Sequence, residues 1–180
     1  MLSLLTILAH AAASELPKHS EGTEDCITET NTGSAQNRGR TNIQKASLAY
    51  GVVFLLVGVM GFIPGITTNY ESLAGAGHHS EALLLGIFQV SILHNVVHLL
   101  YGVAGLLLAR SAGGARAFML WGGVVYLVLW IYGLVIDGES AANFVPLNNA
   151  DNWLHLFLGV TMIGLALLLT RSRDRAARTA

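Results

Sequence analysis

Four apolar stretches, each long enough to cross a lipid bilayer, constrain this sequence more than any other feature. The hydrocarbon core of a membrane needs about 20 residues of helix, and the four stretches are 48–66, 83–109, 117–136 and 153–170. Backbone groups in lipid find no water, so each stretch must satisfy its own hydrogen bonds as a helix. The sequence therefore predicts an all-α fold: a polytopic membrane protein with a four-transmembrane-helix bundle. A helix over 83–109 would be about 40 Å long, so we expect it to tilt or to project beyond the membrane.

The composition agrees with a membrane protein of one domain. The 180 residues are 53% hydrophobic and 12% charged, whereas soluble domains average roughly 45–50% and roughly 25%. The basic residues are not interleaved with aromatic ones, so no nucleic-acid partner is expected. The single cysteine, Cys26, cannot form a disulfide within the chain. The expected partner is the lipid bilayer, and a homo-oligomer or a second membrane protein remains an open alternative.

The positions of lysine and arginine predict the orientation. All ten precede the first apolar stretch, lie between the second and third, or follow the fourth. The charged residues of the other two loops are all acidic, namely Glu71, Glu81, Asp137, Glu139 and Asp151. Because basic loops stay in the cytoplasm, both termini are predicted to be cytoplasmic, an N-in/C-in arrangement. The membrane domain is expected over 46–171, followed by a basic cytoplasmic tail over 172–180.

The segment 1–45 is expected to be a disordered cytoplasmic tail. It is rich in Glu, Thr, Ser, Asn and Gly and has little to bury. Its opening residues, MLSLLTILAHAAAS, are similar to a signal peptide, but they lack a basic start. Cleavage would also leave the basic residues that precede the first apolar stretch outside the cell. Whether residues 1–45 belong to the mature protein is left open.

The second and fourth apolar stretches repeat a motif. HNVVHLLYGV begins at His94 and DNWLHLFLGV begins at Asp151. The first and third stretches share a weaker match, GVVFL with GVVYL. The pattern predicts a duplicated two-helix unit with a pseudo-two-fold axis along the membrane normal. We expect the second and fourth helices to meet as an inner pair.

A polar cluster is predicted where these two helices meet. Its candidate residues are His94, Asn95, His98, Asp151, Asn152 and His155. Polar residues inside a membrane face the bundle interior or a water-filled cavity. The first interpretation is a structural network of hydrogen bonds that holds the helices together. The second is a metal site of His94, His98, His155 and Asp151, or a haem between His98 and His155. The third is a proton or solute pathway. If His94, His98, Asp151 and His155 converge, we expect Asp151 to stay ionised and to support a neighbouring imidazolium.

Four segments carry a family resemblance: GFIPGIT, LGIFQVSILHNVVHLLYGVAGL, GGVVYLVLWIYGL and VPLNNADNWLHLFLGVTMIGL. Together they resemble the bacterial membrane proteins of domain-of-unknown-function family 4383, over roughly 50–168. The resemblance implies a multi-pass, mostly actinobacterial protein of the inner (plasma) membrane. It implies no activity.

The functional expectation is therefore a non-enzymatic membrane protein whose buried cluster is structural or binds a ligand or metal. No catalytic residue is expected, and no cofactor is required by this interpretation. One alternative is a haem- or metal-dependent membrane redox protein. A further alternative is a small proton or solute permease.

Overall fold

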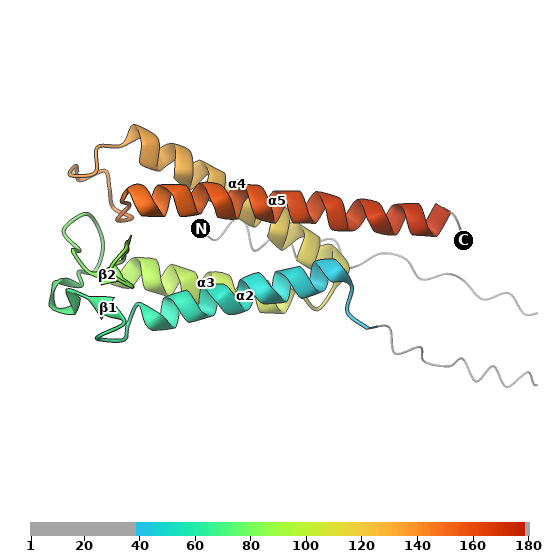
Figure 1. Ribbon diagram of the computed structural model, residues 1–180, viewed down its shortest axis with the longest axis horizontal. Helices are drawn as coiled ribbons and strands as arrows, with labels where there is room; N and C mark the ends of the chain where they lie inside the picture. The colour runs from blue at the N-terminus through green and yellow to red at the C-terminus, as the bar shows by residue number, and fades with distance from the viewer. Residues whose placement is uncertain (1–38, 179–180) are drawn as a thin grey trace, which may run out of the picture. The chain divides into compact units, whose positions relative to one another are not determined.

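The computed structural model describes residues 39–178, with side chains through residue 170. Most of the expected N-terminal tail therefore lies outside the described residues. The described part forms four α-helices: α2 (Asn42–Met60), α3 (Ile92–Leu108), α4 (Ala112–Val135) and α5 (Asn149–Arg178) (Figure 1). One 3₁₀ turn, η1 (Tyr70–Ser72), and three two-residue strands lie between α2 and α3. The strands β1 (Thr67–Thr68), β2 (Leu83–Leu84) and β3 (Phe88–Gln89) form an antiparallel sheet in that order.

The helices have the length and surface of membrane segments. By length and composition α2, α4 and residues Asn149–Thr170 of α5 could cross a membrane, and α3 is a shorter apolar helix of 17 residues. Large apolar side chains such as Leu56, Leu100 and Val128 are exposed on their outer faces. Polar residues instead lie inside, which is the pattern expected of helices in lipid. The chain is mostly helical and has the character of a membrane protein.

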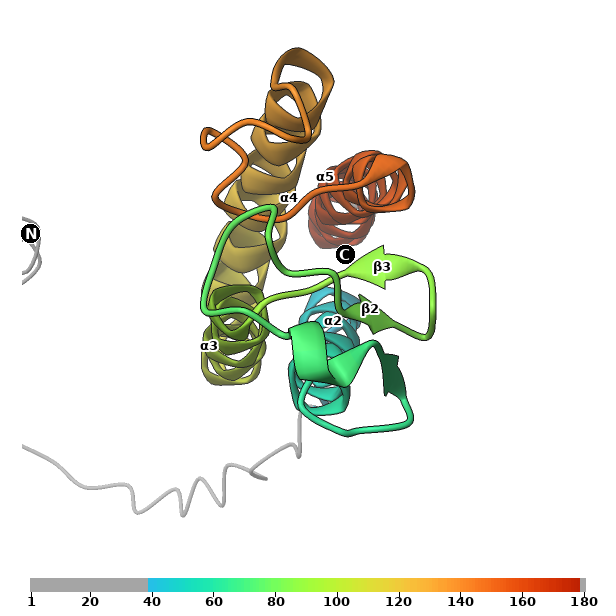
Figure 2. The ribbon, with the colours of Figure 1, turned by 90° about the vertical axis from the view of Figure 1, so that its left-hand side faces the viewer.

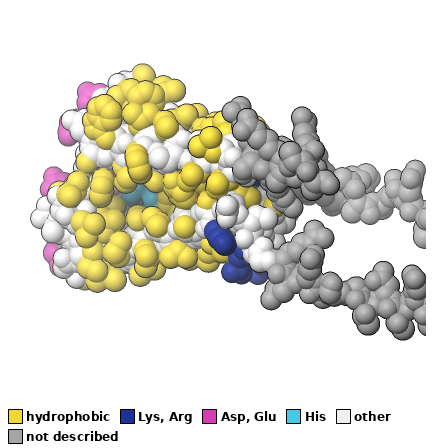
Figure 3. Space-filling model, turned by 45° about the vertical axis from the view of Figure 1, so that its right-hand side comes forward, with side chains coloured by type: hydrophobic (Ala, Val, Ile, Leu, Met, Phe, Trp, Pro, Cys, Tyr) yellow, Lys and Arg dark blue, Asp and Glu magenta, His cyan; other side chains and the backbone are white. Residues whose placement is uncertain are grey.

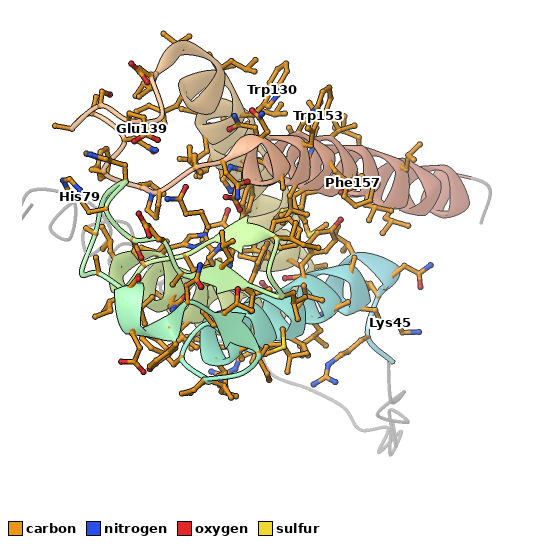
Figure 4. The ribbon with its side chains drawn as sticks, turned by 60° about the vertical axis from the view of Figure 1, so that its left-hand side comes forward. Lys45, His79, Trp130, Glu139, Trp153 and Phe157 are labelled. Atoms are coloured by element: carbon orange, nitrogen blue, oxygen red, sulfur yellow. The ribbon has the colours of Figure 1, made fainter. Side chains whose placement is uncertain are left out.

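The described part of the bundle has a basic end and an acidic end. The basic end holds Arg40, Lys45, Arg110 and Arg116, and hydrogen bonds from Gln44 Nε2 to the Ala109 and Arg110 carbonyls join the start of α2 to the α3–α4 turn there. The acidic end carries the sheet and the α4–α5 loop. Figure 3 shows Lys and Arg at one end, Asp and Glu at the other, and an apolar band between them. In Figure 4, Lys45 lies at the opposite end from His79 and Glu139.

The second apolar stretch differs from expectation, because α3 begins at Ile92 rather than at residue 83. Leu85 and Gly86 adopt positive φ angles of 54° and 71° and turn the chain between β2 and β3. Such angles interrupt a right-handed helix. The Ser91 hydroxyl then accepts a hydrogen bond from the His94 amide at 3.2 Å and caps the new helix. The stretch is a hairpin followed by a helix, not one long helix.

The helices pack as two hairpins, α2 with α3 and α4 with α5 (Figure 2). Glycines allow close backbone approach in each. A Cβ on Gly51 would lie 3.0 Å from the Gly102 carbonyl, and one on Gly123 would lie 2.9 Å from the Gly159 carbonyl. Small residues commonly permit such contact between membrane helices. The expectation that the second and fourth helices form an inner pair is wrong, since α3 and α5 pack mainly on their hairpin partners, and the most extensive contact between the hairpins is that of α2 with α4.

An aromatic group fills the space between the hairpins. Phe54 of α2 stacks on Tyr126 of α4, with ring centroids 5.5 Å apart. Tyr101 and Phe118 pack against Phe54 at 5.0 and 6.5 Å between centroids. Towards the basic end the core continues through the buried Met119 and Met162. This packing fills the interior of the bundle between the basic end and the histidines of α3 and α5.

Candidate functional site

Three histidines form a buried wall between the hairpins, here called the histidine wall. His94 and His98 come from successive turns of α3, and His155 comes from α5. Their side chains are 9%, 7% and 4% exposed. The His94 and His98 rings stand perpendicular with centroids 4.5 Å apart. The wall rests on the aromatic group, because His98 contacts Phe54 edge-on and His155 lies over Tyr126.

The imidazoles of the histidine wall are unpaired. The Nδ1 atoms of His94, His98 and His155 are buried without a hydrogen-bond partner, and the buried Tyr101 hydroxyl beside them lacks one too. Most buried polar groups in proteins are paired, and leaving one unpaired costs about 1–3 kcal/mol. Four unpaired polar groups in one region therefore indicate a place where a polar atom of another molecule would bind favourably.

Two apolar cavities lie on either side of the histidine wall. The α2/α5 cavity has a volume of about 230 Å³, and the α3/α4 cavity has a volume of about 330 Å³. All three histidines line both cavities. The remaining lining residues are apolar, apart from Asp151 in the first cavity and Tyr101 and Tyr126 in the second. The histidines thus place hydrogen-bonding groups in otherwise apolar spaces.

Both cavities reach the outer, apolar faces of the helices. Exposed Val53 and Leu85 line the α2/α5 cavity, and exposed Val97, Val125 and Phe144 line the α3/α4 cavity. Figure 3 shows histidine atoms in a hollow between two apolar surfaces. A molecule dissolved in lipid could therefore reach the imidazoles sideways, between the hairpins.

Asp151 lies beside the wall but makes its hydrogen bonds elsewhere. Its Oδ2 accepts the backbone amides of Gln89 at 3.0 Å and Asn148 at 3.1 Å, and Asn148 Oδ1 accepts the Asp151 amide at 3.0 Å. The first bond ties β3 to the start of α5, and the other two cap that helix. None of the hydrogen bonds of Asp151 to described residues involves an imidazole. The expected support of a histidine by this carboxylate is therefore not seen.

Asn95 and Asn152 do not join the histidine wall, since they line neither cavity. Asn95 is fully buried against Gly61 of its hairpin partner, and Asn152 packs against Gly133 in the same way. Asn152 Nδ2 donates to the Gly133 carbonyl at 3.0 Å. Both amides thus face the helix preceding them in the chain. Of the six candidates, the structure brings His94, His98, His155 and Asp151 together around one cavity and separates the two asparagines from them.

A family comparison covers this whole arrangement. The family described as a domain of unknown function (DUF4383) matches residues 44–168, which include the histidine wall and both cavities. The chain belongs to this family. Neither the curated proteins nor the solved structures include a significant match.

The arrangement of the His, Cys, Asp and Glu side chains within the DUF4383 domain can be compared with that of a metal site. Among the residues that the structure describes, no group of three or more His, Cys, Asp or Glu side chains is arranged to hold a metal ion. The His94 and His98 rings stand edge to face. The arrangement suits hydrogen bonding to a ligand.

Sequence reasoning missed three residues of this DUF4383 site. Phe54 and Tyr126 support the histidine wall, and Tyr101 lines the α3/α4 cavity. Tyr101 shares the helical face of His94 and His98, which could have revealed it. Phe54 and Tyr126 occupy equal positions after GVV in the first and third stretches, and that correspondence was the available signal.

Proposed function

We propose that this DUF4383 protein binds a neutral, lipid-soluble small molecule at the histidine wall. The observation that carries the proposal is the set of three buried imidazoles without hydrogen-bond partners, lining apolar cavities that reach the lipid-facing surface. Ligand sites are typically apolar spaces with a few placed polar groups, as these are. A bound molecule with oxygen or nitrogen atoms would pair the imidazoles, and its apolar part would fill the cavities.

The proposed topology has four membrane spans and both termini in the cytoplasm of a bacterial cell. The charge distribution supports it, because the described Lys and Arg side chains gather at the basic end. The 17-residue α3 is slightly short for a span. Its hairpin with the longer α2 favours a full crossing, because the two helices approach closely both at Gly51 and Gly102 and at Gly58 and Asn95. The histidine wall then lies in the outer half of the membrane.

The proposal includes a duplicated two-helix unit. Equivalent positions make equivalent contacts in the two hairpins. A Cβ on Gly102 would lie 2.6 Å from Leu55 Cγ, and one on Gly159 would lie 2.7 Å from Leu127 Cδ2. Asn95 against Gly61 and Asn152 against Gly133 form a second such pair. The histidine wall would then be built from matching turns of α3 and α5, around an approximate two-fold axis.

Two alternatives receive less support from the geometry. A haem between His98 and His155 needs one flat slot, whereas the space is divided into separate cavities on either side of the wall. A permease needs a path through the bundle interior to the basic end, and the closely packed rings of Phe54, Tyr101 and Tyr126 fill the interior beneath the wall. Ligand binding requires neither a slot nor a path.

The experiment is extraction of neutral lipids from purified full-length protein, followed by mass spectrometry. The wild type should retain a neutral molecule that His98→Leu loses. His79→Leu is the matched control, because His79 is exposed in a loop and lines neither cavity. Equal retention of every extracted molecule by all three proteins would reject the proposal.

A further inference from the structure

We propose that the ligand of the histidine wall is a prenylated quinone, a flat ring with two carbonyl oxygens and a long apolar tail. This inference rests on the ligand-binding function proposed above. It is drawn from the charge of the site, the kind and placement of its hydrogen-bonding groups, and the shape of the groove beyond the α3/α4 cavity.

The charge of the site disfavours anionic lipids. Neither cavity is lined by Lys or Arg, and the one charged residue that lines either of them is the acidic Asp151. The described basic side chains lie at the basic end of the bundle. Fatty-acid carboxylates and phospholipid phosphates prefer Arg or Lys partners. A neutral head group is therefore the better match.

The hydrogen-bonding groups suit a molecule with two acceptor oxygens. A neutral imidazole has one N–H donor, and a tyrosine hydroxyl can also donate. His94, His98 and Tyr101 offer such groups from α3, and His155 offers one from the opposite hairpin. The carbonyl oxygens of a quinone lie at opposite ends of its ring. One ring could therefore accept from both hairpins at once.

The walls suit a flat ring. Tyr101, Tyr126 and Phe144 contribute aromatic rings to the lining of the α3/α4 cavity. Aromatic faces pack favourably in offset-stacked or edge-to-face arrangements with other rings. The α3/α4 cavity, at about 330 Å³, is within the range of pockets that hold small ligands, roughly 300–1,000 Å³. The head group would occupy this cavity.

A groove for the tail continues from the α3/α4 cavity. A second hollow of about 300 Å³ shares Tyr101 and Val125 with that cavity and runs between α3 and α4 to Leu108 and Trp121. Its lining is apolar apart from the Tyr101 hydroxyl. Because Leu108 ends α3 beside the basic end, the two hollows together follow the α3–α4 seam for most of the helix length. A linear isoprenoid chain matches this shape better than a compact neutral molecule does.

The test measures retention of menaquinone-4 by the full-length protein in detergent after gel filtration. Dioleoylglycerol, a neutral lipid without a ring, and palmitate are tested in parallel. Wild type and His79→Leu should retain menaquinone-4. His98→Leu and Tyr101→Phe should each lose about tenfold in affinity, the upper range for one hydrogen bond. Tyr101→Phe removes a single oxygen, so it keeps the test valid if His98→Leu folds poorly.

The outcomes separate the two proposals. Retention of menaquinone-4 that is lost in the site variants supports both. Retention of dioleoylglycerol but not of menaquinone-4, with the same loss in the variants, overturns the quinone and leaves the binding function intact. If palmitate is the probe that is retained best, the claim of a neutral head group is overturned in both proposals. Retention of no probe, or equal retention by wild type and variants, overturns the quinone proposal, and the extraction experiment then decides the binding function separately.

Discussion

Phe54 and Tyr126 stack nearly parallel where the two hairpins meet, with ring centroids 5.5 Å apart and ring planes 16° apart. Each ring also touches one histidine, Phe54 with His98 and Tyr126 with His155. The pair therefore joins the hairpins and supports the site at the same time. Loss of either ring should affect both stability and binding.

Substituting Phe54 by Ala should destabilise the protein by on the order of 2 kcal/mol. Comparable changes in soluble cores cost about 3–5 kcal/mol. The smaller value is expected because lipid already provides an apolar surrounding, so mainly packing is lost. Trp153→Ala is the control, since Trp153 is 69% exposed on α5 (Figure 4). Thermal unfolding in detergent, followed by circular dichroism, measures both. Equal effects of the two substitutions would contradict the supporting role of the stack.

Larger residues at Gly102 and Gly159 should separate the helices of each hairpin. A Cβ at either position would lie under 3 Å from a leucine side chain of the partner helix. Gly102→Val and Gly159→Val should therefore each lower the midpoint of thermal unfolding. The control is Gly164→Val on α5, where a Cβ would have no neighbour within 4 Å. If the hairpins are duplicates, the two destabilising variants should behave alike, and a strong effect in only one of them would count against the duplication.

Replacement of Asp151 should separate its hydrogen-bonding role from its charge. Asp151→Asn keeps an oxygen that can accept the Gln89 and Asn148 amides, so stability should fall by less than about 1 kcal/mol. Asp151→Leu leaves both amides without that acceptor and should cost about 1–3 kcal/mol. Thermal unfolding of the two variants provides the comparison. An equal and large loss in both would show that the negative charge itself is required.

The proposed orientation predicts which loops face outward. In a Cys26→Ser background, cysteines at the exposed positions Glu71 and Glu139 should react with an impermeant thiol reagent in intact cells. A cysteine at Gly113, exposed in the first turn of α4, should react only after the membrane is opened. The reverse pattern would invert the topology.

The sequence was informative about the apolar helices and less informative about their arrangement. Hydropathy places the helices because lipid permits little other backbone structure. It could not place the break at Leu85 and Gly86, since their positive φ angles depend on the surrounding sheet. The repeat drew attention to His98 and His155, and both are buried beside the same cavities. It also suggested that Asn95 and Asn152 join them, but a step of one residue rotates a side chain by about 100° around the helix, which is enough to direct it towards another partner. Pairing of helices depends on shape, which apolar sequences encode weakly.

The last prediction concerns the stability of the ligand-free protein. A buried imidazole without a partner costs free energy, and replacing it by an apolar group of similar size can be stabilising. His98→Leu should therefore unfold at a higher temperature than the wild type when both are stripped of lipid-soluble molecules. A histidine that belonged to a structural network would give the opposite result, because its loss would leave a partner unpaired.

Tyr101→Phe should behave in the same way, since the Tyr101 hydroxyl is also buried without a partner. Each stabilisation should be on the order of 1 kcal/mol. Added ligand should raise the unfolding temperature of the wild type more than that of either variant, because only the wild type keeps every group that the ligand can pair. Differential scanning measurements with and without ligand give both quantities. More stable variants with a weaker response to ligand are the combination expected if the polar groups of the site serve binding at the expense of stability. Destabilised variants that still respond fully to ligand would instead make the histidine wall a structural feature.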